Sequence, residues 1–252
     1  MANTTIEWTE STWNPSTGCT KISPGCKNCY AHELAFRLQK MKNPKYVNAF
    51  DYTEHQKDLE IPLHWKKPRK IFVNSMSDLF HEQATDEFIT KIFETMLKAD
   101  WHTFQILTKR PEIMKKFVLN LLKLKGLTKL PNHIWLGVSI ENQDYVNRLE
   151  LLKEIPCIRF ISFEPLLGSI TEANLIGIHW VIIGGESGPN FRPVKKEWIL
   201  SVKQLCDRDL VPFFFKQWGG FTPKSGGCEL DHKIYHAYPK ISNEKITLEL
   251  FQ

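Results

Sequence analysis

The stretch TFQILTKRPEIMKKFVLNLLKLKGLTKLPNHIWLGV, residues 103–138, contains the unit that decides the fold. Its two ends, TFQIL and IWLGV, are nearly continuous apolar runs, as expected of strands buried on both faces of a parallel sheet. Residues 111–125 between them are amphipathic with helical spacing. A strand, a helix and a second strand in this order predict a βα unit with a right-handed crossover.

The same alternation of apolar runs and amphipathic segments continues through most of the chain. Four further apolar runs are IFV (71–73), IRFI (158–161), WVII (180–183) and VPFFF (211–215). Four further amphipathic segments cover residues 29–41, 86–98, 142–153 and 195–209. Strands that alternate with helices favour a parallel sheet, so we expect an α/β fold built as a full or partial (β/α) barrel, TIM-like in plan.

The length favours a single domain, because a barrel of this kind uses roughly 200–250 residues. We expect that domain to cover residues 1–252, with residues 221–252 as a C-terminal extension. In this extension Ile246, Leu248 and Leu250 alternate, which indicates a closing strand or hairpin over residues 241–251.

The composition excludes several classes of protein. With 42% hydrophobic and 24% charged residues, the chain is globular rather than disordered. No apolar run approaches the ~20 residues that span a bilayer, and the N-terminus MANTTIEWTE lacks an export signal. We therefore expect a cytoplasmic protein without a membrane segment. The net charge is +5, and residues 61–130 hold 13 Lys and Arg against 7 Asp and Glu, which permits a polyanionic partner.

Polar residues follow all six apolar runs at the points where the strands would end. They are Asn74, Ser75, Ser77 and Asp78; Thr108, Lys109 and Arg110; Ser139, Glu141 and Asn142; Ser162 and Glu164; Gly184, Gly185, Glu186 and Ser187; Lys216 and Gln217. The carboxyl ends of parallel strands lie on one rim, where α/β active sites are built. The simpler interpretation is that these are exposed loops, which are polar in most proteins.

Several of these residues have both a functional and a structural interpretation. Asp78 and His81, three positions apart, suit acid–base or ligand-binding work, although Asp78 can equally cap the following turn. Lys109 and Arg110 suit binding of a phosphate or carboxylate, or form a solvated loop. A carboxylate that follows a buried strand, such as Glu141, can bind ribose hydroxyls or pair with a nearby cation.

The same choice applies to the residues that follow the later strands. Glu164 has the two roles open to Glu141, and Gly184 with Gly185 allows the backbone to approach a ligand closely. A Gly–Gly–Glu sequence alone is weak evidence for a ligand site. Here an apolar strand precedes it, which strengthens that interpretation.

The sharpest motif is CTKISPGCKNC, residues 19–29, which spaces three cysteines as C-x6-C-x2-C. Since no export signal is present, a metal site is a better interpretation than disulfides. Cys19, Cys26 and Cys29 can bind three irons of a [4Fe–4S] cluster and leave the fourth open. With His32 they can form a Cys3His zinc site, and three unligated buried thiols are the third alternative.

Longer stretches around these residues resemble a known family. They are IEWTESTWNPSTGCTKISPGCKNCYA (6–31), RKIFVNSMSDLFH (69–81), FQILTKRPE (104–112), IWLGVSIENQ (134–143), RFISFEPLLG (159–168), WVIIGGESGP (180–189) and VPFFFKQWGG (211–220). The chain is similar to the phage-associated three-cysteine-motif family, radical-SAM-like proteins of poorly defined function. The resemblance runs in order from residue 6 to residue 220 and so covers nearly the whole chain.

This resemblance implies a cofactor and a chemistry. Cys19, Cys26 and Cys29 would hold the [4Fe–4S] cluster, and S-adenosylmethionine would bind its open iron. Electron transfer would then cleave the sulfonium to a radical that abstracts hydrogen from a substrate. Tyr30 matches the aromatic residue that often shields the cluster.

Two departures from the wider radical-SAM class change which residues are assigned to the cofactor. The first cysteine spacing is six residues rather than three, and the only Gly–Gly–Glu, at residues 184–186, follows a late strand instead of the second one. Asn74, Ser77 and Asp78 are therefore the candidates for the methionine end, and Glu186 for a ribose or substrate contact. The remaining cofactor-binding candidates are Ser139, Glu141, Glu164, Gly184 and Gly185.

Two hypotheses follow for the function. The first is a radical S-adenosylmethionine enzyme with Asp78, His81 and Lys109 as catalytic residues, an external electron donor, and a nucleic acid or nucleotide as substrate. The second is a zinc- or cluster-stabilised protein that binds nucleic acid without catalysis. Either protein would work in the cytoplasm of a bacterium or of a phage-infected host cell.

Overall fold

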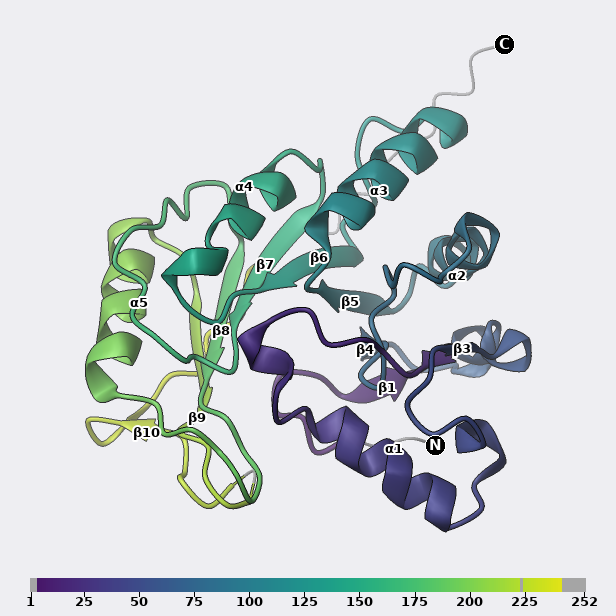
Figure 1. The fold of residues 1–252 in the computed structure, drawn as a ribbon. Helices are drawn as coiled ribbons and strands as arrows, with labels where there is room; N and C mark the ends of the chain where they lie inside the picture. The colour runs from purple at the N-terminus through teal and green to yellow at the C-terminus, as the bar shows by residue number, and fades with distance from the viewer. Residues whose placement is uncertain (1–3, 223, 242–252) are drawn as a thin grey trace.

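The computed structural model describes residues 4–222 and 224–241, and its main feature is a seven-stranded parallel sheet. The strands lie side by side in chain order: β1 (Ser11–Trp13), β4 (Lys70–Val73), β5 (Thr103–Thr108), β6 (Ile134–Ser139), β7 (Ile158–Phe163), β8 (Trp180–Gly184) and β9 (Phe213–Gln217). The sheet curls into a half-barrel, with helices along its outer side (Figure 1). This confirms the predicted α/β fold in its partial-barrel form.

The helices lie where the amphipathic segments predicted them. They are α1 (Tyr30–Lys40), α2 (Asp86–Lys98), α3 (Pro111–Lys125), α4 (Asn147–Lys153) and α5 (Lys196–Arg208). The segment 142–153 is divided into a short 3-10 turn, Gln143–Tyr145, and the two-turn helix α4. Other 3-10 turns are Pro24–Cys26, Pro44–Tyr46, Gln56–Asp58 and Ile61–His64.

Local sequence explains where two of these helices begin and end. The Thr85 hydroxyl accepts a hydrogen bond from the Phe88 backbone N–H at 3.2 Å, which caps the first turn of α2. α3 ends at Gly126, whose φ of 65° is the left-handed conformation that glycine adopts without strain. The apolar faces of both helices pack on the outer surface of the sheet.

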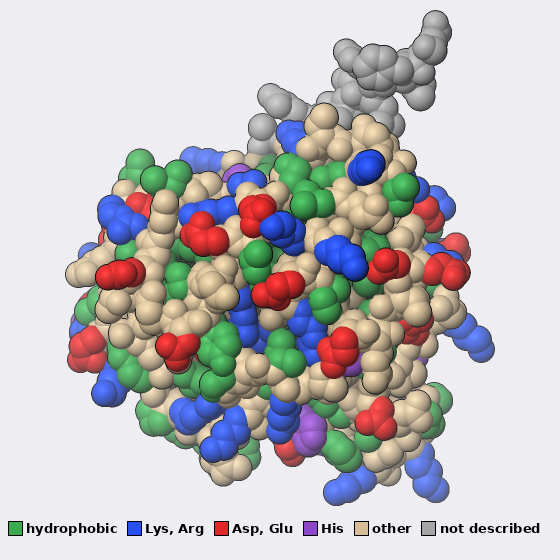
Figure 2. All heavy atoms as spheres, turned by 45° about the horizontal axis from the view of Figure 1, so that its top comes forward, with side chains coloured by type: hydrophobic (Ala, Val, Ile, Leu, Met, Phe, Trp, Pro, Cys, Tyr) green, Lys and Arg blue, Asp and Glu red, His purple; other side chains and the backbone are tan. Residues whose placement is uncertain are grey.

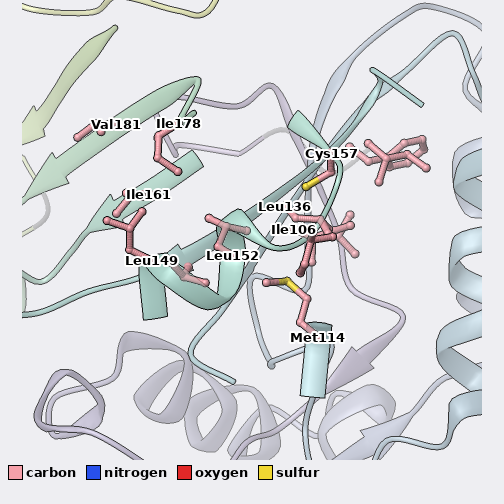
Figure 3. Close-up of a cluster of buried hydrophobic side chains, with 14 of the residues drawn as sticks. Ile106, Met114, Leu136, Leu149, Leu152, Cys157, Ile161, Ile178 and Val181 are labelled. Carbon is pink, nitrogen blue, oxygen red and sulfur yellow. The ribbon is translucent and has the colours of Figure 1, made fainter. Parts of the chain in front are cut away.

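The pleat of the strands divides the core into two layers. One layer joins the outward-facing strand residues to the helices, and Figure 3 shows part of it: Ile106, Met114, Leu136, Leu149, Leu152, Cys157, Ile161, Ile178 and Val181. The other layer fills the inside of the half-barrel with aromatic rings, namely Trp8, Phe72, Trp135, Phe160, Trp180 and Phe214.

The inner layer ends in polar residues at the carboxyl ends of the strands. Two positions beyond three of the inward-facing rings comes a polar side chain: Asn74 after Phe72, Ser162 after Phe160, and Lys216 after Phe214. Because side chains alternate along a strand, these polar groups lie above the aromatic rings inside the half-barrel. The rim position predicted for them is therefore correct.

β1 is a strand that the sequence analysis did not predict. It is only three residues long, Ser11–Trp13, and pairs parallel to β4. Within the described residues the sheet does not close: β1 and β9 are its outermost strands, and residues 235–237 form antiparallel hydrogen bonds with the outer side of β9. The segment around residues 237–238 contacts both the sheet and the segment before β1: the Trp180 indole donates to the Ala237 carbonyl at 2.8 Å, and the Tyr238 hydroxyl to the Glu7 carbonyl at 3.2 Å.

The rest of the structure consists of two small antiparallel pairs. β2 (Ser16–Thr17) pairs with β3 (Thr53–Glu54), and β10 (Glu229–Leu230) pairs with β11 (Lys233–Ile234). The strand or hairpin predicted around Ile246, Leu248 and Leu250 lies outside the described residues. Among the residues that the structure describes, no helix is long and apolar enough to cross a membrane.

Candidate functional site

A cavity of about 390 Å³ lies at the carboxyl ends of the strands, within the size range of ligand sites. It brings together most of the residues that the sequence suggested. Those that line it are Cys19, Cys26, Cys29, Tyr30, Asn74, Ser77, Asp78, Lys109, Ser139, Glu164, Gly185 and Glu186. His81, Glu141 and Gly184 are not on its wall. The structure therefore places all three cysteines and nine of the twelve other candidates around one space.

The cysteine loop connects β1 to α1 and is anchored at its start by backbone contacts. Gly18 has a φ of 82° and packs so closely that a Cβ would lie 2.2 Å from the Asp51 carbonyl oxygen. Its N–H donates to the Met76 carbonyl, and the N–H of Cys19 donates to the Phe50 carbonyl, both at 3.0 Å. These contacts direct Cys19 into the cavity.

Arg110 holds the first cysteine in place. Its guanidinium donates to the Asp78 carboxylate at 3.1 Å, to the Thr20 hydroxyl at 2.7 Å and to the Cys19 sulfur at 3.5 Å. Burial raises the pKa of the Cys19 thiol to about 11, with a further contribution from Asp78, while Arg110 opposes both. Arg110 is buried, so the solvated-loop interpretation of this residue is wrong.

Glu141 supports the middle of the same loop. This fully buried carboxylate accepts hydrogen bonds from the Ser23 hydroxyl at 2.5 Å and from Arg148 at 2.9 Å. Gly25 passes so close that a Cβ there would meet the Glu141 carboxylate at 2.5 Å. Lys109 Nζ lies 3.8 Å from Glu141.

The surroundings of Cys26 lower the pKa of its thiol, whereas those of Cys19 raise it. Burial raises its pKa, but Lys109 and hydrogen bonds from Ile22 and Ser23 more than offset this, so the net pKa is lowered. The thiolate, which is the metal-binding form, is therefore easier to form at Cys26 than at Cys19.

Glu186 secures the end of the loop. Its carboxylate accepts a hydrogen bond from the Asn28 amide at 3.0 Å and from the backbone and side chain of Arg192 at 2.8 and 2.9 Å. Although burial raises the pKa of Glu186, these bonds hold it below its ordinary value. A Cβ on Gly185 would lie 2.0 Å from the Trp218 carbonyl oxygen, so this glycine allows the loops after β8 and β9 to pack together.

Asp78 and His81 also hold loops together. Asp78 accepts hydrogen bonds from the Thr108 hydroxyl at 2.7 Å, the Lys109 N–H at 3.1 Å, Arg110, and the N–H of Phe80. His81 is buried, with one ring nitrogen 3.2 Å from the Thr20 hydroxyl and the other accepting from the Gln83 N–H.

Other polar side chains line the cavity, and one of them has a hydrogen-bond acceptor without a partner among the described residues. Asn74 has a φ of 61° and donates to the Ser16 hydroxyl at 3.0 Å, but its Oδ1 has no partner in the part of the chain that the structure describes. Ser77 bonds Ser16, with its hydroxyl 2.9 Å from that of Ser16. Across the cavity, Lys216 pairs with Glu164 at 2.6 Å.

Tyr30 and Ser139 complete the wall near these groups. The Tyr30 hydroxyl donates to the Ser75 carbonyl at 2.5 Å, which ties the start of α1 to the loop after β4. Ser139 ends β6, and its carbonyl accepts a hydrogen bond from Arg148 at 2.7 Å. Gly184 lies next to the Glu164 side chain: a Cβ on Gly184 would be 3.4 Å from the carboxylate carbon of Glu164.

Four residues that support the cysteine loop were missed by the sequence analysis: Ser23, Asn28, Arg148 and Arg192. The position of Ser23 and Asn28 inside the cysteine motif was a signal that could have found them. Arg148 and Arg192 had no such signal, because they lie outside the cysteine motif and act on its loop only through Glu141 and Glu186, seven and six positions away in the sequence.

The three cysteines share one cavity without forming a closely grouped ligand set among the described residues. Within residues 4–222 and 224–241, no three His, Cys, Asp or Glu side chains are grouped closely enough to hold one metal ion. A [4Fe–4S] cluster requires less crowding, because each of its cysteines binds a different iron. His32, the fourth ligand in the zinc alternative, does not line the cavity and packs instead against Phe36 and Phe50.

Charge on the surface is mixed. Figure 2 shows Lys, Arg, Asp and Glu side chains interspersed over the face it presents. Several lysines of the basic segment 61–130 are paired with acids, including Lys115 with Glu154 at 2.5 Å and Lys125 with Glu94 at 2.8 Å. Because Glu94 belongs to the same segment, only the Lys115 pair of these two lowers the positive excess of residues 61–130.

Comparison with known proteins identifies a family. No curated protein and no solved structure matches this chain. The sequence profile of one family, described as a protein of unknown function (DUF5131), matches residues 3–240. That description names no cofactor, substrate or reaction. Since the match covers nearly the whole chain, the protein belongs to the DUF5131 family.

Proposed function

We propose that this protein is a radical S-adenosylmethionine enzyme whose [4Fe–4S] cluster is held by Cys19, Cys26 and Cys29. The observation that supports this best is that one loop after the first strand presents three thiols to the same cavity as the polar ends of the later strands. A partial β/α barrel is also a fold common among enzymes. When bound, such a cluster supplies one electron for the reductive cleavage of S-adenosylmethionine.

The protein's own residues would bind the methionine end of the cofactor. Asn74 has a buried acceptor without a partner in the described chain, which suits the amino group. Lys109 lies on the cavity wall, 3.8 Å from a Glu141 that already pairs with Arg148, so its charge is available for the carboxylate. Ser77 lines the same cavity, and because its hydroxyl donates to the Ser16 carbonyl, its oxygen would act as an acceptor for the ligand.

Other residues would orient the rest of the cofactor and exclude water. Glu164 and Ser139 line the same cavity and would bind the ribose hydroxyls, and Tyr30 would shield the cluster. The aromatic rings of Trp8 and Phe72 pack on each other and form an apolar part of the cavity wall, which would keep water away from that part of the site.

The geometry favours positioning roles for four other candidates. Asp78, His81, Glu141 and Glu186 already have their hydrogen-bonding groups engaged in holding the cysteine loop or the strand ends beside it. We therefore propose that these residues act through the loop, and that Lys109 is the charged residue that contacts the cofactor.

The test is the metal content and activity of protein purified without oxygen. We expect about four irons and four sulfides per chain in the wild type, and 5′-deoxyadenosine from S-adenosylmethionine under reducing conditions. Cys26→Ala should lose the iron and the product. Cys228→Ala, in a half-buried thiol that does not line the cavity, is the matched control and should keep both.

Two results would overturn the proposal. One is a Cys26→Ala protein with wild-type iron and activity. The other is one zinc per chain and no sulfide, which would support the zinc-stabilised nucleic-acid-binding protein instead. Product formation that requires an added reductant would support the need for an external electron donor.

A further inference from the structure

A second hollow, of about 610 Å³, shares one residue, Cys19, with the cavity described above. We call it the outer groove, and its wall also includes Lys21, His32, Phe36, Val47 and Phe50. Cys26 and Cys29 line the first cavity but not this groove. Cys19 can therefore be approached from a side that S-adenosylmethionine would not occupy.

Printed contacts join the wall of the outer groove into one surface. The Cys19 N–H donates to the Phe50 carbonyl at 3.0 Å. The Phe50 ring lies 5.2 Å from the His32 ring, and the His32 ring lies 4.8 Å from the Phe36 ring, centroid to centroid. The cysteine loop, α1 and the segment before β3 are thus in direct contact, so a single partner can touch all three.

Apolar side chains of the groove are left exposed. Phe36 is 41% exposed and Val47 is 65% exposed. The segment that carries Val47 is fixed against α1, because the Gln39 amide donates to the Val47 carbonyl at 2.9 Å. Exposed apolar groups around a hollow favour a protein partner, since protein interfaces combine an apolar centre with a polar rim.

The chain around the groove is basic. Residues 19–51 contain six Lys and Arg against two Asp and Glu. Lys45 pairs with Asp58. The other five cations are exposed and form no ion pair within the described part of the chain: Lys21, Lys27, Arg37, Lys40 and Lys42. The two acids are Glu33, 3.3 Å from His32, and Asp51. A partner that complements this surface is therefore acidic.

We propose that the outer groove docks the electron donor of this enzyme, a small acidic protein that carries single electrons. The inference rests on the proposed function, because only a reducible cluster requires such a partner. The reduced carrier loses one electron, and the cluster bound to Cys19 gains it. Docking at the groove leaves the first cavity open to cofactor and substrate. Nucleic acid fits the surface less well, because it requires cations along its whole track rather than around an apolar centre.

The binding experiment uses two acidic carriers, a flavodoxin and a [2Fe–2S] ferredoxin. Each is labelled with ¹⁵N and titrated with this protein in about 20 mM salt while its NMR spectrum is followed. Cytochrome c, a basic carrier, and a short single-stranded DNA are the comparisons. Because neither measurement needs the cluster, binding can be read without activity.

Two variants change the surface, and a third is their control. Arg37→Glu with Lys40→Glu reverses two exposed cations in the last turn of α1. Lys116→Glu with Lys123→Glu makes the same change of charge on α3, away from α1 (Figure 1). Val47→Ser removes an exposed apolar contact, and it keeps the test informative if charge reversal disturbs α1.

We expect at least one acidic carrier to bind with a Kd below about 1 mM, and cytochrome c not to bind. The double variant in α1 should weaken binding about 10-fold, and about 200 mM salt should reduce the difference. Val47→Ser should weaken it about 3-fold. The α3 variant should bind as the wild type does. With dithionite, which needs no docking surface, all variants should form 5′-deoxyadenosine at the wild-type rate.

Three outcomes would overturn the inference. They are the absence of binding by both acidic carriers, equal losses in the α1 and α3 variants, and binding of DNA alone, which would make the groove a nucleic-acid interface. Iron content and the dithionite reaction separate this inference from the proposed function. A loaded protein that reacts with dithionite but binds neither carrier refutes the docking surface alone, whereas a protein without iron refutes the proposed function and the inference with it.

Discussion

Replacing Arg110 with methionine tests whether this residue holds the cysteine loop. Methionine has a similar length but no charge, so the variant removes the hydrogen bonds to Asp78, Glu82, Thr20 and Cys19 and leaves most of the packing. The loop should then lose its anchor at Cys19. We expect lower stability and lower iron content together.

The magnitude of the loss can be worked out from the burial of the partners. The side chains of Arg110 and Asp78 are 6% and 9% exposed, and a buried hydrogen bond to a charged group contributes about 1.5–3 kcal/mol. Glu82 is 50% exposed, so its pair with Arg110 adds less than about 1 kcal/mol. Asp78 keeps its other three donors, which limits the cost of leaving it without a counter-charge. We therefore expect Arg110→Met to lower the free energy of unfolding by about 3 kcal/mol.

Urea unfolding of the wild type and the variant measures this difference. In a chain of this length it corresponds to a fall of about 6–12 °C in Tm. Lys125→Met is the control, because Lys125 pairs with Glu94 where both side chains are about 40% exposed, and the loss of such a pair should change stability by less than about 0.5 kcal/mol. A loss below about 1 kcal/mol for Arg110→Met, with normal iron content, would refute the reasoning.

Three further predictions concern the loop, a buried histidine and a helix end. Gly25→Ala should reduce iron content, since a Cβ there would lie 2.5 Å from the Glu141 carboxylate; unchanged iron would contradict the contact. Burial lowers the pKa of His81 below 6.5, as NMR titration should show, and Glu82 and Asp78 do not fully reverse this. Protonation therefore favours the unfolded chain, so stability should be highest above about pH 6.5 and fall as the pH drops below it; a His81 pKa of 6.5 or more would contradict this. Gly126→Ala should cost about 1 kcal/mol in urea unfolding, because its φ is 65°, while iron content stays normal; a neutral effect would show that this helix end relaxes.

Most strands and helices could be predicted from the sequence because the residue patterns that indicate them are local. A buried parallel strand needs a run of apolar residues, and a helix needs an apolar face that repeats every three or four positions, as in residues 86–98 and 111–125. β1 gave no such signal, since Ser11–Trp13 is too short to show a pattern and becomes a strand only by pairing with β4. Segment 142–153 was periodic enough for a helix, but the Asn142 side chain accepts from the Asp144 N–H and begins a separate 3-10 turn.

The candidate site was readable only in part. The clustering of the cysteines within residues 19–29 and the position of polar residues after each strand were visible in the sequence, because chain connectivity alone brings them to one rim. Which of those polar residues face the cavity with free hydrogen-bonding capacity could not be read. Asn74 and Glu141 both follow a strand, yet one has an acceptor without a partner in the described chain and the other is fully engaged.

The sequence by itself therefore determined the architecture, the rim and the cysteine loop, since these depend on hydrophobic periodicity and on residues close together in the chain. Only the tertiary structure decided which side chains hold that loop. Ser23 bonds Glu141 from 118 positions away, Asn28 bonds Glu186 from 158, and Arg110 bonds Thr20 from 90. Hydrogen bonds and charge pairs depend on distances of a few ångström in space, and no local pattern of residues encodes distances that folding creates between separate strands.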